Sequence, residues 1–302
     1  METIEELKRR IQSTEDLQSV VKTMKSLAAV KIRQFQRAVE SLEDFNDTIK
    51  MALRIVLRSG PGLFIRERDS AEKDRIGCVV FGSDQGMCGQ LNDQVVSEAM
   101  DLVARLGIQP DNLLLAAAGY RAAARLHAQG QKVAASFSMP GSVEAITDKV
   151  EEILFKIEEL NDEHGIETIY LFHARPAEGA SYRPVTQRLL PVDRNWLQEL
   201  KKDPWPTRML PIFTMDREVL FSELIQQYLF AALFRAFAES LASENASRLA
   251  SMQGAERNIR DRLGELNNRY HQQRQMSITA ELLDIVSGFE ALEGEEGDSH
   301  GT

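Results

Sequence analysis

The chain has 302 residues, is 43% hydrophobic and carries a formal net charge of −10, which argues against a general nucleic-acid-binding protein. Its two cysteines, Cys78 and Cys88, are too few for a disulfide framework and favour a reducing compartment. No apolar run approaches the roughly 20 residues of a membrane-spanning helix, and the acidic start does not resemble a signal peptide.

The first predicted element is a long helix over residues 1–58. Residues 3–57 contain neither glycine nor proline, and apolar side chains recur at alternating steps of three and four from Ile4 to Val56. This spacing predicts a coiled-coil helix rather than an ordinary amphipathic one. Basic residues outnumber acidic ones between positions 8 and 37. They form either a solvated helix face or a basic surface for an acidic partner, and the charges alone leave both readings open.

Residues 59–215 are predicted to form a central α/β domain, because short β-rich runs alternate there with stretches of helical pattern. The β-rich runs lie at 76–81, 113–117, 133–137, 166–172 and 183–190, and the helical stretches near 90–106, 119–128 and 142–163. Strands and helices that alternate at these lengths predict a small, mostly parallel, Rossmann-like sheet.

The loop at residues 82–89, Gly-Ser-Asp-Gln-Gly-Met-Cys-Gly, follows a strand and opens a helix, where backbone amides can hold a phosphate. It matches neither G-x-G-x-x-G nor the Gly-Lys-Ser/Thr of a P-loop, so a tight structural turn is favoured over a phosphate site. The five histidines lack metal-ligand spacing, and neither Cys88 nor Asp84 has an evident acid or base partner. The sequence therefore predicts no catalytic residue, no cofactor and no metal ion.

A second long helix is predicted over residues 216–292, followed by an acidic, disordered tail at 293–302. This helix repeats the apolar ladder of the first, and the two stripes can cover each other only in an antiparallel coiled coil. At about 1.5 Å per residue, the second helix outruns the first by about 20 residues. A partner must enclose the unpaired tip, residues 277–292, unless the tip folds onto the central domain or self-associates. The apolar residues of the tip are Ile278, Leu282, Leu283, Ile285, Val286 and Phe289.

Three parts of the chain resemble the gamma subunit of F-type ATP synthases. Residues 24–33, Met-Lys-Ser-Leu-Ala-Ala-Val-Lys-Ile-Arg, resemble part of the first helix of that family. Residues 83–92, Ser-Asp-Gln-Gly-Met-Cys-Gly-Gln-Leu-Asn, resemble its central loop. The fullest match is C-terminal, at 243–252 and 274–288. These matches cover both long helices and the central domain in the order of the family.

The resemblance implies the central rotor shaft of an F1Fo ATP synthase or ATPase. Such a shaft couples ion flow through a membrane c ring to catalysis at the alpha/beta ring by rotation. The implied partners are the F1 alpha and beta subunits, the epsilon subunit and the membrane c ring, without nucleic acid and without direct membrane insertion. The catalytic sites then belong to other chains, so we expect a non-catalytic, peripheral subunit at the cytoplasmic face of the bacterial cell membrane.

The resemblance also implies which residues contact partners, since family positions linked to rotor–beta contact and coupling are matched here. They are Met24, Lys25, Arg248, Arg274, Gln275, Thr279 and Glu281. The chain departs from the family at Ser26, Gln85 and His271, where the family has Met, Arg and Asn. These departures suggest a divergent bacterial paralogue, and a sodium-translocating F-type ATPase is one hypothesis.

Two other functions remain alternatives to a rotor. The first is a nucleotide-dependent enzyme built on the central domain with helical arms. The second is a static coiled-coil adaptor, whose arms self-associate when no partner is present. An enzyme requires specific nucleotide binding by the central domain, whereas a rotor does not.

Overall fold

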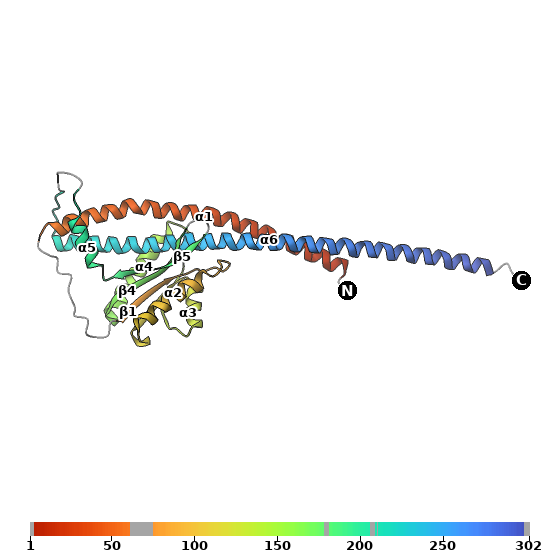
Figure 1. Ribbon diagram of the computed structural model, residues 1–302, viewed down its shortest axis with the longest axis horizontal. Coiled ribbons are helices and arrows are strands. Elements are labelled where there is room, and N and C mark those ends of the chain that lie inside the picture. The colour runs from red at the N-terminus through yellow and green to blue at the C-terminus, as the bar shows by residue number, and fades with distance from the viewer. Residues whose placement is uncertain (1–2, 61–74, 178–180, 206–208, 210, 299–302) are drawn as a thin grey trace. The chain divides into compact units, whose positions relative to one another are not determined.

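The computed structural model describes residues 3–60, 75–177, 181–205, 209 and 211–298 (Figure 1). Its helices and strands in chain order are α1 (Ile4–Arg58), β1 (Arg75–Phe81), α2 (Leu91–Leu106), β2 (Leu113–Ala118), α3 (Tyr120–Ala128), β3 (Val133–Phe137), α4 (Ala145–His164), β4 (Ile166–Pro176), β5 (Tyr182–Leu190), α5 (Arg194–Lys202) and α6 (Arg217–Asp298). The chain divides into two compact units. One consists of the residues up to Ser26 together with those from Met252, and the other of Leu27–Ser251.

A five-stranded sheet lies in the unit Leu27–Ser251, with the strand order β3-β2-β1-β4-β5. Strands β3, β2, β1 and β4 run parallel, and β5 pairs antiparallel with β4. Val80 of β1 lies in register with Ala117 of β2 on one side and with Phe172 of β4 on the other. The predicted mostly parallel α/β sheet is therefore confirmed, with β5 as its antiparallel edge.

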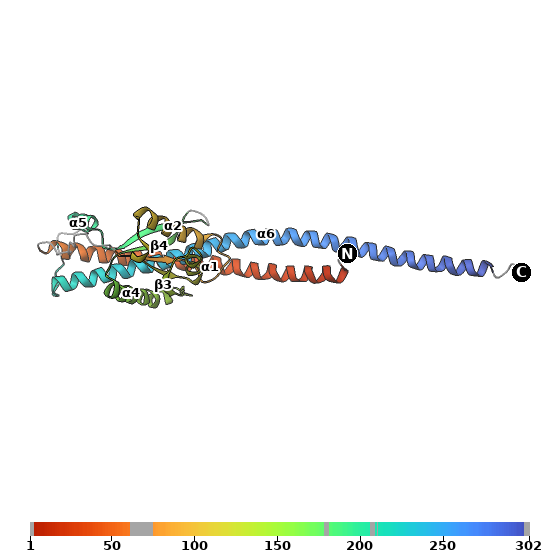
Figure 2. The ribbon, with the colours of Figure 1, turned by 90° about the horizontal axis from the view of Figure 1, so that it is seen from below.

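Side chains alternate across the sheet, so each strand contributes to two cores. Val79 and Phe81 of β1 pack with α4 and α6, where the rings of Phe81 and Phe237 meet edge-to-face with centroids 4.9 Å apart. Cys78 and Val80 pack with α2 and α3 instead. Figure 2 shows α2 and α4 on opposite sides of the sheet. Burial on both faces explains why the central strands β1 and β2 read as nearly continuous apolar runs in the sequence.

Within this unit, α1 and α6 run antiparallel. Arg217 Nε, at the start of α6, donates to the carbonyl oxygen of Val56 near the end of α1, at 2.9 Å. A further apolar cluster joins both helices to α5, a short helix that the sequence patterns did not predict. The side chain of Asp193 caps α5 by accepting a hydrogen bond of 2.9 Å from the backbone N–H of Asn195.

The other unit contains the first part of α1 and the last part of α6. Its buried apolar residues include Leu7, Met252 and Leu266, and Lys25 of α1 forms an ion pair of 2.5 Å with Glu256 of α6. Helix α1 begins with a capping box in which Thr3 and Glu6 exchange backbone-to-side-chain hydrogen bonds of 2.9 and 3.2 Å. The predicted pairing of the N-terminal and C-terminal helices is thus confirmed in each unit.

Helix α6 runs to Asp298, past the predicted end at residue 292. Residues 293–298 are therefore helical, although a disordered tail was predicted to begin at 293. The segment Glu-Ala-Leu-Glu that precedes this end consists of strong helix formers, which favours continuation of the helix. The rest of the predicted tail, 299–302, lies outside the described residues, as do residues 61–74 of the predicted central domain. None of the helices in the described part of the chain has an apolar stretch long enough to span a bilayer.

Candidate functional site

The carboxyl ends of β1 and β4 lie side by side at the point where the connections of the sheet diverge. From β1 the chain leads through α2 to β2 on one side, whereas β4 lies on the other side and is reached through α4. In doubly wound sheets, ligands bind in the crevice outside the carboxyl ends of the strands at such a switch point. A nucleotide site is therefore expected here if the central domain has one.

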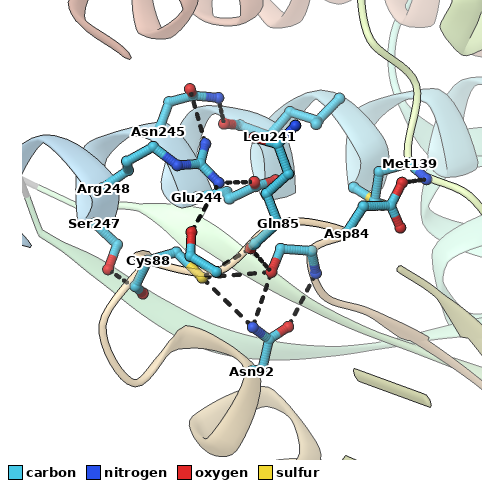
Figure 3. Close-up of polar contacts among 12 residues, drawn as sticks. Asp84, Gln85, Cys88, Asn92, Met139, Leu241, Glu244, Asn245, Ser247 and Arg248 are labelled. Atoms are coloured by element: carbon cyan, nitrogen blue, oxygen red, sulfur yellow. Dashed lines mark hydrogen bonds and ion pairs between the residues drawn. The ribbon is translucent and has the colours of Figure 1, made fainter. Parts of the chain in front are cut away.

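Helix α6 occupies this crevice. Ser243 Oγ donates to the carbonyl oxygen of Ala174 at the end of β4, at 3.0 Å. Ser247 Oγ donates to the carbonyl oxygen of Cys88 in the loop after β1, at 2.5 Å, and both serines are buried (Figure 3). Because side chains of α6 bond to the strand ends directly, the geometry favours the structural turn over the phosphate site for residues 82–89.

Arg248 joins this loop to α6 (Figure 3). Its guanidinium donates to Glu244 Oε1 at 2.5 Å, to Asn245 Oδ1 at 3.3 Å and to the carbonyl oxygen of Gly86 at 3.4 Å. The residue is only 9% exposed. Burial raises the pKa of Glu244, although the charge of Arg248 and its hydrogen bond oppose that rise. In the chain by itself, Arg248 therefore bonds to its own unit rather than presenting a free charge.

The loop also holds itself together and anchors two neighbouring segments. The backbone N–H of Ser83 donates to Asn92 Oδ1, and Asn92 Nδ2 donates to Ser83 Oγ, both at 2.9 Å. The carboxylate of Asp84 accepts from the backbone N–H of Tyr120 at 3.0 Å and of Met139 at 2.8 Å. Asp84 therefore positions the start of α3 and the segment after β3, a role that no sequence pattern indicated.

A second buried polar cluster lies between β4 and α6. Glu239 Oε2 lies 2.8 Å from His173 Nε2 and accepts from Arg175 Nε at 2.8 Å. His173 is fully buried, and its Nδ1 has no hydrogen-bond partner among the described residues. Burial acts to raise the pKa of Glu239, but the hydrogen bonds from His173 and Arg175 outweigh it, so the pKa is lowered. Sequence reasoning missed this cluster because 66 positions separate His173 from Glu239.

The residues Met24 and Lys25 lie in the other unit. The hydrogen bond from Lys25 lowers the pKa of Glu256, which stays charged and holds Lys25 against α6. Met24 is partly exposed. Lys25 is therefore paired within the chain, and Met24 keeps part of its apolar side chain accessible.

The remaining predicted contact residues, Arg274, Gln275, Thr279 and Glu281, are all exposed on α6. Thr279 Oγ1 donates to the carbonyl oxygen of Gln275 at 2.9 Å, within the helix. Arg274 forms no hydrogen bond or ion pair with any residue in the described ranges. Its guanidinium is thus available to a partner, in contrast to that of Arg248.

Beyond these positions α6 exposes a series of large apolar side chains. Every residue from 278 to 287 is exposed. The apolar ones, with Met276, are between 46% and 61% exposed: Met276, Ile278, Leu282, Leu283, Ile285 and Val286. The exposed apolar tip that was predicted for this helix is confirmed for residues 278–287. The predicted tip residue Phe289 lies beyond the side chains that the structure describes. Such a patch marks an interaction surface.

Two long terminal helices, a small α/β domain whose crevice is filled by one of them, and an exposed apolar helix tip define a protein that acts through partner contacts. The family described as ATP synthase matches residues 3–292. The chain therefore belongs to the ATP synthase family.

The curated relatives are gamma chains of that enzyme. The ATP synthase gamma chain of Polynucleobacter necessarius subsp. necessarius (strain STIR1) is 26% identical over 295 residues, which cover 97% of this chain and 100% of the relative. The gamma chain of Desulforamulus reducens is 29% identical over 293 residues, with the same coverage of 97% and 100%. These matches confirm the resemblance to the gamma subunit of F-type ATP synthases.

Solved structures show the same fold. A rotor chain of the Euglena gracilis mitochondrial ATP synthase matches with a TM-score of 0.64 at 15% identity, over 91% of this chain and 98% of that chain. A chain from the central stalk and c ring of the Tetrahymena thermophila mitochondrial enzyme matches with a TM-score of 0.55 at 22% identity, over 78% and 99%. The predicted fold class is thereby confirmed a second time.

Proposed function

We propose that this chain is the central rotor shaft of an F-type ATP synthase. Its partners are then the F1 alpha and beta subunits, the epsilon subunit and the membrane c ring, at the cytoplasmic face of a bacterial cell membrane. The family match over residues 3–292 supports this proposal, as do the relatives called gamma chains and the similar chains from a rotor and a central stalk. An asymmetric shaft couples rotation to catalysis because it contacts chemically equivalent sites differently at each angle.

The observation that carries the proposal is the apolar tip of α6. Its large side chains, among them Leu282, Leu283 and Ile285, are each more than half exposed. Burying one such side chain in a partner is worth about 1.5–3 kcal/mol, so a ring of subunits that encloses the tip gains several such contributions. The tip therefore fits a bearing in the alpha/beta ring.

We infer that the chain itself is non-catalytic. The crevice in which an α/β enzyme binds its ligand holds Ser243 and Ser247 of α6, and the carboxylate of Asp84 is taken up by two backbone N–H groups. We expect the purified chain to hydrolyse no ATP, and its addition to an alpha/beta ring to change the turnover of the ring. Hydrolysis by the chain alone, with ring subunits excluded, is incompatible with this inference.

Substitutions in the tip test the rotor assignment. The chain is co-expressed with its alpha and beta subunits, and the amount of chain recovered with the ring is measured. Leu282→Asp with Ile285→Asp places two charges in the apolar patch, so we expect at least a tenfold loss of recovered complex. Asn268→Asp, also exposed on α6 but before the tip, is the matched control and leaves recovery unchanged. Equal recovery of both variants would rule out the tip as the bearing surface.

The contact residues follow from the same proposal. We assign partner contact to Met24, Arg274, Gln275, Thr279 and Glu281, which are all at least partly exposed. Lys25 and Arg248 act through their bonds to Glu256 and Glu244 within the chain. The departures at Ser26, Gln85 and His271 are the basis of the sodium hypothesis, whereas the ion itself is selected by the c ring and not by this chain.

A further inference from the structure

A polar cleft of about 420 Å³ opens in the unit Leu27–Ser251, and none of its lining residues belongs to the loop at 82–89. It is walled by α1, α6 and the two strands at the antiparallel edge of the sheet. The lining residues are Asn46, Lys50, Arg175, Val185, Thr186, Gln187, Tyr228, Ala232 and Arg235. Three of them are cations and none is a carboxylate, in a chain with a net charge of −10.

The three cations come from three different elements and differ in how far they are neutralised. Lys50 Nζ on α1 pairs with Asp47 at 2.8 Å. Arg175 on β4 uses its Nε on Glu239, and its two Nη groups form no hydrogen bond within the described part of the chain. Arg235 on α6 is half-buried and forms no hydrogen bond or ion pair with the residues that the structure describes.

Two carboxylates pair with these cations, the exposed Asp47 and the buried Glu239. The hydrogen bond from Lys50 lowers the pKa of Asp47, and the charge of Arg235 contributes to the same shift. Glu239 is occupied by His173 and Arg175. A third carboxylate, Glu98, accepts a hydrogen bond of 2.8 Å from the lining Thr186 and lies 4.0 Å from Arg105. Lys50 is paired with Asp47 and Arg175 with Glu239, so Arg235 is the lining cation without an ion pair among the described residues. An anion entering the cleft relieves the mutual repulsion of the cations.

We propose that this cleft binds the phosphate group of a small molecule. A phosphate carries a charge of about −1.5 to −2 at neutral pH and three strong acceptor oxygens, which suits three cations better than a single carboxylate does. Guanidinium groups match phosphate oxygens in a planar, bidentate geometry. The neutral polar residues Asn46, Gln187 and Tyr228 also line the cleft. This binding is separate from the rotor function proposed above.

The architecture keeps the cleft open in the absence of a ligand. The ring of Tyr228 stacks on Trp196 of α5, with centroids 4.9 Å apart and an interplanar angle of 29°. The Arg175 side chain is fixed by its hydrogen bond to the buried Glu239. Two walls are therefore preorganised, which lowers the cost of binding.

Calorimetric titration of the full chain at low salt tests the proposal. The probes are inorganic phosphate and ATP, each with the wild type, Arg235→Gln, Lys50→Gln and Lys132→Gln. Lys132 is exposed just before β3, at the opposite edge of the sheet from β5, so this control removes one positive charge far from the cleft. We expect saturable binding of at least one probe, at least tenfold weaker with Arg235→Gln and Lys50→Gln and unchanged with Lys132→Gln.

The two probes separate the sources of the phosphate. Binding of both identifies a general phosphate site, whereas binding of ATP alone identifies a nucleotide or polyphosphate. Absence of saturable binding of both probes to the wild type at millimolar concentrations overturns the proposal, as does an equal loss with Lys132→Gln. Circular dichroism checks the fold of each variant. If Arg235→Gln fails to fold, the comparison rests on Lys50→Gln, because the side chain of Lys50 is 43% exposed and its replacement should not disturb the fold.

Discussion

Two buried glutamates on α6 show that the same kind of residue can respond to burial in opposite ways. At Glu244 burial prevails over the single partner Arg248, and the pKa of the carboxyl group is raised. At Glu239 the donors His173 and Arg175 prevail over burial, and the pKa is lowered. Glu239 has two donors, and each hydrogen bond to a carboxylate favours its charged form. Glu244 has the one hydrogen-bonded cation Arg248, and the charge of Asp84 raises its pKa further.

This difference predicts a pH-dependent contribution of Glu239 to stability. Since its pKa is lower in the folded chain than in the unfolded chain, the contribution is present above the ordinary pKa of about 4.3 and is lost as the pH falls through the folded value. Glu239→Gln should therefore lower the free energy of unfolding at pH 7 by about 1–3 kcal/mol, and by less at pH 4. Urea titrations at both pH values measure this.

The control for this prediction is Glu151→Gln, because Glu151 is exposed on α4. It should change the unfolding free energy by less than about 0.5 kcal/mol at either pH. A loss with Glu239→Gln that is the same at pH 7 and pH 4 would show that the carboxylate charge is not what stabilises the cluster.

Arg248 gives a second prediction at the scale of single residues. Arg248→Ala leaves the buried Glu244 without its partner, and removing one member of a buried ion pair costs about 3–5 kcal/mol of unfolding free energy. The double variant Arg248→Ala with Glu244→Ala should cost clearly less than the sum of the two single variants, because neither charge is then left alone. A double-mutant cycle measured by chemical denaturation gives the interaction energy of the two side chains. If the losses of unfolding free energy in the two single variants add up to that of the double variant, the side chains do not interact.

At the scale of elements, the long helices are predictable from local spacing. The 3-and-4 ladder of apolar residues and the absence of breakers predicted a helix ending at residue 58, and α1 ends at Arg58. The end of α6 was less predictable, because helix formers followed by glycines leave the last turns open to either outcome. The sequence indicated that the C-terminal part of α6 is unpaired only through the greater predicted length of this helix. In the structure α6 has 82 residues and α1 has 55.

The exposed tip predicts that α6 can be shortened without loss of fold. A stop after Gln275 removes Met276 and every later residue, and the residues from 278 to 287 are all exposed. The melting temperature of the isolated chain should therefore change by less than about 2 °C, since exposed residues contribute little to stability. Recovery with the alpha/beta ring should fall at least tenfold. Early melting of the truncated chain would show that the tip packs onto the chain itself.

At the scale of the whole molecule, the rotor proposal predicts that side chains without an intramolecular role affect the assembled enzyme. Arg274 has no bond to the described residues, and a charge-assisted bond to a partner carboxylate or carbonyl is worth about 1.5–3 kcal/mol. Arg274→Ala with Gln275→Ala should alter ATP hydrolysis by the complex several-fold. Differential scanning calorimetry of the isolated chain should show no change.

The control for this variant is Lys132→Ala, which removes an exposed charge just before β3. Turnover of the complex should be unaffected by it. The opposite result is normal turnover of the complex together with early melting of the isolated variant chain. It would show that Arg274 and Gln275 stabilise the fold and do not take part in coupling.

The sequence by itself determined the elements of this protein, except for α5 and the end of α6, and its family. Helices and strands follow from the spacing of apolar side chains along a local stretch, and motifs such as 83–92 keep their residue types wherever the chain folds. The tertiary structure alone decided the strand order, the filling of the crevice by Ser243 and Ser247, the burial of Arg248 and the pairing of His173 with Glu239. These contacts join residues that are far apart in the chain, and their formation depends on how whole elements pack rather than on any local pattern.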